Sequence, residues 1–332
     1  MSGRLVAAAL AAIATSGAVA ACGSNDKSSS DTPAASTPAD SSASSGKLLK
    51  PDPANSGKSI KIGSKNFTES IIIAEIYGQA LAARGYNVKY DTNLGLEQVA
   101  TKAMKTGQID GYPEYTGTAL TALLGVDPKD VPKDENAAYQ EAKKLYKSKL
   151  NFVALPQTPF TDSNALGMTG ARAKQLGNPK TISDLAKTQS GKLTLAASAE
   201  CFKRTDCALG ITKVYGLKFK KEIPIDVAQR HEVILKGKAD LTIPFTTDGA
   251  IAANKEVVLA DDKHLFPPYN VTMVVRSDAA AKLGPDFEKT IVEVQKGLTT
   301  PVMSELNSRV DLDKQQTKAV ATQYLKAEGF VK

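Results

Sequence analysis

The sequence predicts an α/β fold built as two lobes. Short apolar segments alternate with amphipathic ones from Ser59 onward, a pattern typical of strands and helices that follow one another in a largely parallel sheet. A second alternating run begins after Pro159, and one sheet containing both runs would be unusually crowded. Segments around Gly107 and Gly237, one in each run, also align with each other without gaps. Two lobes, each with its own sheet, account for all three observations.

The residues before this pattern have the composition of an export and attachment segment. Arg4 is followed by an apolar, alanine-rich run and then by small residues that lead to Cys22. This order is typical of a signal peptide, and a cysteine directly after small residues resembles the lipobox of bacterial lipoproteins. We therefore expect a signal peptide over residues 1–21 and a lipid on Cys22. A plain signal peptide with an incidental cysteine is the alternative.

Residues 22–57 are expected to be a flexible tether. Ser, Ala, Asp, Pro and Thr dominate this stretch, which cannot bury enough apolar surface to fold. Lipid and tether together predict a protein that is extracytoplasmic and anchored to the outer face of the cell membrane. The rest of the 332-residue chain has no apolar run long enough for a membrane span and is long enough for two domains.

The first alternating run predicts the elements of the first lobe. Residues 66–85 are expected to form a helix with Asn66 as N-cap, Glu69 as its capping-box partner and Gly85 at its end. The other helices expected in this run cover 96–107, 116–125 and 135–150, and the expected strands cover 59–63, 87–93, 109–115 and 151–155.

The second run predicts the second lobe and then a helical end. Helices are expected over 181–189, 206–216, 229–237 and 248–254, and strands over 192–198, 239–245 and 257–260. After residue 277 the pattern is helical only, over 285–298, 301–310 and 314–330. We expect these last helices to return and cover the first lobe.

The aligned segments, "KTGQIDGYPEYTGT" and "LKGKADLTIPFTTD", share one layout. In each, a helix ends at glycine, an aspartate opens a strand, and an aromatic residue followed by threonine ends it; the aromatics are Tyr115 and Phe245. Ligands of open α/β sheets gather at the carboxyl ends of strands, where helix N-termini offer free N–H groups. Each lobe is therefore predicted to present a ring and a hydroxyl to a ligand. Core packing of strand-end aromatics is the alternative.

No catalytic set emerges from the sequence. His231 and His264 are the only histidines, neither has the spacing of a metal or nucleophile site, and no nucleotide-binding or hydrolase motif is present. We predict a binding protein with no cofactor and no metal, and not an enzyme. Cys201 and Cys207 are expected to form a disulfide in an exported protein. Zinc is the alternative, although two cysteines without a nearby histidine make half a site.

The charges argue against a nucleic-acid partner. The formal net charge is +7, but the lysines are spread along the chain, without an Arg-rich cluster and with few interleaved aromatics. Lys65 is predicted to lie directly before a helix N-terminus, where a cation opposes the helix dipole unless an anion joins it. Arg204 lies inside the loop between the two cysteines. A solvated surface position is the alternative for Lys65.

Five motifs in order carry a family resemblance: "GSKNFTES", "YPEYTGTAL", "VYGLKF", "TTDGAI" and "LADDKHLFPPYNVTMVVR". Together they resemble the solute-binding proteins of ABC importers for glycine betaine, choline, carnitine and proline. The resemblance implies a two-lobed type II periplasmic-binding-protein fold with a ligand cleft between the lobes, a hinge near 156–161 and 266–270, and an ABC permease as partner. Lobe 1 is expected to comprise 58–158 plus 268–332, and lobe 2 159–267. We expect a monomer.

The resemblance also implies roles for residues in these motifs. In relatives, aromatic rings enclose the trimethylammonium group of the ligand and basic side chains hold its carboxylate. Carried across motif by motif, Tyr115 and Phe245 fall on ring positions, and Thr118 falls on a carboxylate contact. Lys65 and Arg204 fall on the two basic contacts.

Two ring positions depart from the pattern of the family. Asn164, in "DSNAL", and His231, in "QRHEVILKGKAD", stand where tyrosines are usual. A glycine betaine-like solute is expected, with a different carboxylate-bearing amine as the alternative because the ring cage is incomplete. A sensory receptor and an enzyme on the same scaffold are the other functions considered. The expected ligand-binding residues are Lys65, Asn66, Tyr115, Thr118, Asn164, Arg204, His231 and Phe245.

Overall fold

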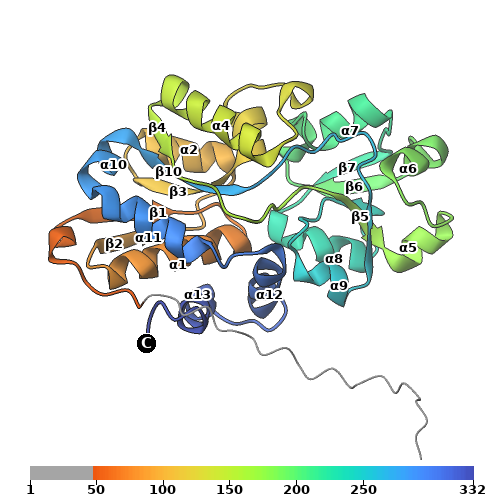
Figure 1. Cartoon of the computed structure of the whole chain (residues 1–332). Helices are drawn as coiled ribbons and strands as arrows, with labels where there is room; N and C mark the ends of the chain where they lie inside the picture. The colour runs from red at the N-terminus through yellow and green to blue at the C-terminus, as the bar shows by residue number, and fades with distance from the viewer. Residues whose placement is uncertain (1–47) are drawn as a thin grey trace, which may run out of the picture. The chain divides into compact units, whose positions relative to one another are not determined.

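The computed structural model describes residues 48–332 and confirms an α/β fold with two sheets (Figure 1). The predicted signal peptide, Cys22 and the tether as far as residue 47 lie outside the described residues. Within the described part of the chain, no helix combines the length and the apolar character needed to cross a membrane. The second half of the chain builds the second sheet and then returns to the first.

The first sheet has five strands in the order β2–β1–β3–β10–β4. β1 runs parallel to β2 and β3, as alternating strands and helices require, whereas β10 runs antiparallel to β3 and β4. β10 comes after every strand of the second sheet in the sequence, so the chain returns to the first sheet at β10. The bounds are Ser59–Gly63 (β1), Asn87–Asp91 (β2), Gly111–Tyr115 (β3), Phe152–Ala154 (β4) and Val271–Arg276 (β10).

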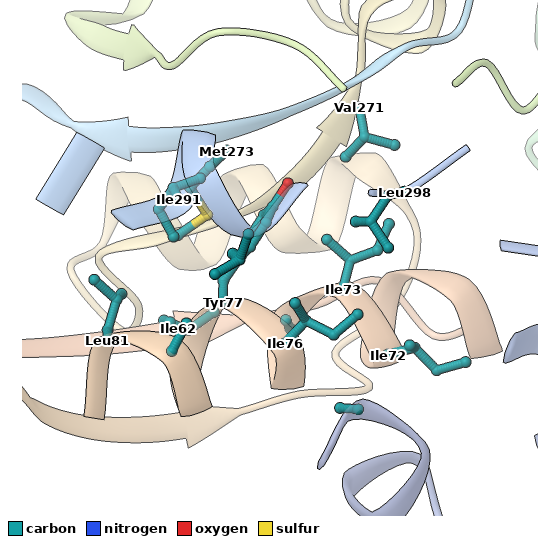
Figure 2. Packing of buried hydrophobic residues seen from close by; sticks show 14 of the residues in the cluster. Ile62, Ile72, Ile73, Ile76, Tyr77, Leu81, Val271, Met273, Ile291 and Leu298 are labelled. Atoms are coloured by element: carbon teal, nitrogen blue, oxygen red, sulfur yellow. The ribbon is translucent and has the colours of Figure 1, made fainter. Parts of the chain in front are cut away.

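Helix α1, Thr68–Ala83, is the central packing element beside this sheet. It is apolar on nearly all sides, which suits a helix enclosed by others, and it packs against α11, α12 and α13 near the C-terminus. Figure 2 shows side chains of α1 in the core together with side chains of neighbouring elements. Those of α1 are Ile72, Ile73, Ile76, Tyr77 and Leu81, and the others labelled are Ile62, Val271, Met273, Ile291 and Leu298. The other helices here are Glu97–Lys105 (α2), Thr116–Thr118 (α3), Glu135–Leu145 (α4), Ser277–Leu283 (α10), Pro285–Gln295 (α11), Thr300–Asp311 (α12) and Thr317–Ala327 (α13).

The second sheet also has five strands, in the order β7–β6–β8–β5–β9. β6 runs parallel to β7 and β8, and β5 runs antiparallel to β8 and β9. A separate apolar core packs against it. The strands are Leu166–Thr169 (β5), Thr194–Ala197 (β6), Lys221–Pro224 (β7), Leu241–Thr242 (β8) and Glu256–Leu259 (β9). The helices are Gly170–Gln175 (α5), Ile182–Gln189 (α6), Ala208–Tyr215 (α7), Arg230–Leu235 (α8) and Gly249–Ala253 (α9).

Two chain crossings connect the sheets and lie side by side. Thr161 and Asn270 form a β-bridge between them. The Asn270 side-chain amide donates to the carbonyls of Thr158 and Phe160, at 3.2 and 3.1 Å. These bonds tie the outgoing crossing to the returning one, so the two segments form one connection between the sheets.

The predicted start of the first helix is wrong. α1 begins at Thr68, its N-cap position is Phe67, and no side chain caps it. Asn66 is held by the neighbouring loop, because its backbone N–H donates to the Gly95 carbonyl. Glu69 does not fold back onto the helix end; its carboxylate is buried and accepts hydrogen bonds from distant segments. Tertiary contacts override the local capping pattern.

Several short elements escaped the sequence analysis. β5, α5 and β7 were not predicted, and the expected strand over 239–245 is reduced to the two residues of β8. β5 and β7 have four residues each, too few to show a clear period. The helix expected over 135–150 ends as α4 at Leu145 and continues as a π turn.

Candidate functional site

A cavity lies where strand ends of both sheets meet. One chamber is lined by Lys65, Phe67, Leu96, Glu97, Tyr115, Thr118, Asp162, Asn164, Arg204, Phe245 and Tyr269. A second chamber shares Leu96, Asn164, Arg204 and Phe245 with it and adds residues that include Cys201, Cys207 and Arg230. Their empty volumes, which include space open to solvent, are about 340 and 410 Å³. A concave site lined by rings and a few convergent polar side chains is typical of small-molecule binding.

Six of the expected ligand-binding residues line this cavity, and two do not. The six that line it are Lys65, Tyr115, Thr118, Asn164, Arg204 and Phe245. Asn66 follows Lys65 in the sequence but does not line the cavity. Its Oδ1 atom has no hydrogen-bond partner among the described residues. His231 points elsewhere: its ring nitrogens contact Glu256 and Asp248, each at 2.9 Å.

Four aromatic rings border the first chamber. The Phe67 ring centroid lies 5.7 Å from that of Tyr115 and 5.3 Å from that of Phe245. Tyr269 is the fourth ring, and its hydroxyl donates to Asp206 at 2.7 Å and accepts from Asn164 Nδ2 at 3.2 Å. The sequence analysis missed Phe67 and Tyr269. Both stand inside the motifs that carried the resemblance, "GSKNFTES" and "FPPYN", which was the available signal.

Lys65 is buried and already paired with an acid of the protein. Its Nζ atom lies 2.5 Å from Glu114 Oε1, and both side chains are almost fully enclosed. The same Nζ lies 4.3 Å from the Tyr115 ring centroid, within cation–π distance. The anion predicted to join Lys65 is thus supplied by β3, one residue before Tyr115. Glu114 holds the ammonium against the ring.

Arg204 makes a two-pronged contact with Asp206, at 2.9 and 2.6 Å. It also reaches Glu97 at 3.5 Å and the Thr118 hydroxyl at 3.4 Å, both on the side of the first sheet. Burial alone would raise the pKa of Asp206, but the Arg204 charge and hydrogen bonds lower it overall. Arg204 therefore bridges the cavity.

A disulfide between Cys201 and Cys207 closes the loop that carries Arg204. Both cysteines are buried and line the second chamber. The Cys207 backbone N–H donates to the Arg204 carbonyl, so the short loop is fixed from within. Within residues 48–332, no group of three or more His, Cys, Asp or Glu side chains is arranged to hold a metal ion.

Arg230 is a third cation on the lining, and the sequence analysis did not select it. Its guanidinium carbon lies 4.7 Å from the Phe245 ring centroid, and the group pairs with Asp248. Burial acts to raise the pKa of Asp248, but Arg230 and His231 hold it well below its usual value. Burial acts to lower the pKa of His231, while the hydrogen bonds that its ring donates to Asp248 and Glu256 raise it to about 9.

The acids at the lining outnumber its cations. Lys65, Arg204 and Arg230 each face a carboxylate of their own, and Glu97 and Asp162 add two more acids. Burial, together with the neighbouring charges of Glu69 and Asp248, raises the pKa of Asp162 well above its ordinary value. Rings and additional acids suit a cationic group of a ligand, and donors left free on the paired cations suit an anionic group of the same molecule.

The chain was compared with known proteins. Residues 58–327 match the family described as the substrate-binding domain of the ABC-type glycine betaine transport system. A glycine-betaine-binding protein of Pseudomonas aeruginosa is 32% identical over 279 residues, which cover 81% of this chain and 88% of the relative. The carnitine transport binding protein OpuCC of Listeria monocytogenes is 27% identical, with 83% and 89% covered.

Solved structures agree with these sequence matches. The crystal structure of a glycine betaine/carnitine/choline ABC transporter protein has a TM-score of 0.63 at 28% identity and covers 80% of this chain and 97% of that one. Apo YehZ from Escherichia coli has a TM-score of 0.59 at 26% identity, with 82% and 99% covered.

These relatives are extracytoplasmic solute-binding proteins of ABC transporters, which confirms the prediction that this protein is not an enzyme. The two-lobed architecture of such binding proteins, also predicted, is confirmed by the same structures. The chain therefore belongs to the family of substrate-binding domains of ABC-type glycine betaine transport systems.

Proposed function

We propose that the protein is a lipid-anchored binding protein that captures a small zwitterionic compatible solute of the glycine betaine type and delivers it to an ABC importer. The observation that carries the proposal is the set of four rings around one cavity beside paired cations. The names of the relatives support the class, because glycine betaine and carnitine both combine a quaternary ammonium with a carboxylate.

The rings and the extra acids suit the cationic end of the ligand. A quaternary ammonium cannot donate a hydrogen bond, so ring faces and nearby negative charge are its natural partners. Phe67 lies between two other rings, and Glu97 borders the same chamber. We infer that the trimethylammonium group lies among Phe67, Tyr115 and Phe245.

The paired cations suit the anionic end. A lysine ammonium has three N–H donors, and Glu114 is the one acceptor that Lys65 contacts among the described residues. Arg204 likewise has donors beyond those that Asp206 uses. A carboxylate between Lys65 and Arg204 would contact both sides of the cavity. That differential contact favours the closed arrangement, as hinge closure requires.

We further infer that the lobes are residues 58–158 plus 268–332 and residues 159–267, and that they close by bending at the two crossings. The bridge between Thr161 and Asn270 supports this assignment, because it keeps both crossings together during a hinge motion. Each sheet keeps its own core on either side of the crossings. We propose that a monomer carries out the capture, since both sides of the cavity come from one chain.

We expect zwitterions to bind more tightly than choline, which lacks a carboxylate for Lys65 and Arg204. Thermal unfolding of the mature protein should be measured with glycine betaine, carnitine, proline and choline at equal concentrations. A ligand at a hundred times its Kd adds about 2.7 kcal/mol to the free energy of unfolding. The largest shift is expected with glycine betaine or carnitine. A larger shift with choline than with every zwitterion would contradict the assignment of the carboxylate contacts.

Membrane attachment is expected to depend on Cys22, because its acyl chains are the anchor that we propose. Cys22→Ala should move the protein from the membrane fraction to the soluble extracytoplasmic fraction. Ser24→Ala, in the same stretch, is the matched control and should stay with the membrane. Membrane fractionation followed by immunoblotting checks this result, and a Cys22→Ala protein that remains membrane-bound overturns the lipoprotein assignment.

A further inference from the structure

Glu69 is a buried carboxylate that does not line the cavity. Only 2% of its surface is exposed. Its Oε1 atom accepts a hydrogen bond from the Tyr115 hydroxyl at 2.8 Å. Its Oε2 atom accepts one from Thr247 Oγ1 at 2.5 Å and one from Asn307 Nδ2 at 3.0 Å. Three donors from distant parts of the chain thus converge on one side chain.

The three donors come from three separate segments of the chain. Tyr115 ends β3 and turns its ring to the cavity, Thr247 lies between β8 and α9 beside the second sheet, and Asn307 lies on α12. Asn307 Nδ2 also reaches the Thr247 carbonyl at 3.2 Å. The Glu69 carboxylate therefore connects a ring of the ligand cavity to a segment of the other lobe.

The contact surface around Thr247 is tightly packed. α9 packs against α12, and a Cβ atom on Gly249 would collide with the hydroxyl of Ser308 on α12. Thr247 is fully buried, and its backbone N–H donates to Asp162 Oδ1 at 3.0 Å. Glu69 lies at the centre of this junction, where few other groups could replace its hydrogen bonds.

We propose that Glu69 is a positioning residue that links the orientation of Tyr115 to closure of the two lobes. The inference rests on the proposed function in that a ligand closes the lobes around Tyr115. Hinge opening separates Thr247 from Glu69, while Tyr115 and Asn307 stay with α1 in the first lobe. Oε2 then loses its shortest hydrogen bond and meets water. A carboxylate suits this position because both of its oxygens accept, whereas an amide accepts with only one.

Several charged groups surround the Glu69 carboxylate. Burial, with the Asp248 charge in the same direction, raises the pKa of Glu69 above 4.5, although the hydrogen bonds from Thr247, Asn307 and Tyr115 lower it. The charged and titratable groups that face this junction are Asp162, Asp248, Asp311, Arg230 and His231, with Tyr115 and the Lys65–Glu114 pair on β3 and its neighbouring turn.

The first test needs no ligand. The fraction of closed molecules in the ligand-free mature protein should be measured from the distance between two spin labels, one in each proposed lobe. We expect this fraction to fall about tenfold in Glu69→Gln and in Thr247→Val, since each removes the hydrogen bond that joins Thr247 Oγ1 to Glu69 Oε2 across the lobes. Glu75→Gln, on the same helix but away from the junction, is the matched control and should keep the closed fraction of the unmodified protein.

The second test uses glycine betaine as the probe. Calorimetric affinities of Glu69→Gln, Thr247→Val and the double variant should each fall about tenfold, with the double variant no weaker than either single one, because one shared bond is lost. An unchanged closed fraction in Thr247→Val, or losses that add in the double variant, would overturn the inference. A smaller closed fraction in the variants, without any glycine betaine binding by the unmodified protein, leaves the inference standing and refutes the proposed ligand.

Discussion

Arg204→Ala is expected to weaken ligand binding more than Tyr115→Ala or Phe245→Ala. Removing Arg204 takes away one of the two cations proposed for the carboxylate and leaves Asp206, whose side chain is fully buried, without its partner. Losing one member of a desolvated, hydrogen-bonded charge pair typically costs about 2–5 kcal/mol. One ring face contributes about 0.5–2 kcal/mol, and three rings share the cation in the proposed arrangement. The charge pair therefore outweighs any single ring.

Titration calorimetry with the best ligand of the thermal screen measures these differences. Arg172→Ala is the matched control, because Arg172 pairs with Asp240 at 2.9 Å in the same lobe without lining the cavity. Its affinity should equal that of the unmodified protein. If Arg204→Ala binds normally while Tyr115→Ala loses most of its affinity, the rings dominate and the proposed carboxylate contact at Arg204 is wrong.

Loss of the Cys201–Cys207 disulfide is expected to leave a folded protein that binds at least about tenfold more weakly. The disulfide closes a six-residue separation, and so short a loop contributes about 2–3 kcal/mol to the free energy of unfolding. Arg204 lies inside this loop, so an open loop must be ordered again each time ligand binds. Ordering each mobile side chain costs about 0.5–1.5 kcal/mol, and a cost of 1.4 kcal/mol is tenfold in affinity.

The Cys201→Ser/Cys207→Ser double variant tests this without a reductant. Affinity comes from calorimetry and stability from thermal unfolding of the same samples. Dithiothreitol should weaken binding by the unmodified protein to the level of the double variant and should not affect the variant itself. Equal affinities of both proteins, or two free thiols in the native exported protein, would refute the role of the disulfide.

Much of the fold was predictable from hydrophobic periodicity and from the residues that mark the ends of helices and strands. The switch from strand to helix pattern around Tyr115 and Phe245 located the ends of β3 and the segment after β8, and both rings line the cavity. The positions of these two rings were predictable because ligands of open α/β sheets bind at the carboxyl ends of strands, where both rings lie. Lys65 was predictable for a similar reason, as a cation placed before a helix start. Its partner Glu114 was not, because that pairing forms between separate strands and turns.

The errors came from residues whose role is set by tertiary contacts. Glu69, three residues after Asn66, matched a capping pattern, yet its carboxylate bonds Tyr115, Thr247 and Asn307, which are far away in the sequence. His231 aligned with a ring position, but two carboxylates draw it away from the cavity. No local pattern distinguishes these outcomes, because the competing partners lie on other elements.

A crystal structure of the mature protein with glycine betaine would show where each end of the ligand binds. We expect the trimethylammonium group within about 6 Å of the ring centroids of Phe67, Tyr115 and Phe245. We expect the carboxylate within hydrogen-bonding distance of Lys65 and Arg204. Ligand bound outside this cavity, or bound inside it with the carboxylate turned away from both cations, would refute the proposed site.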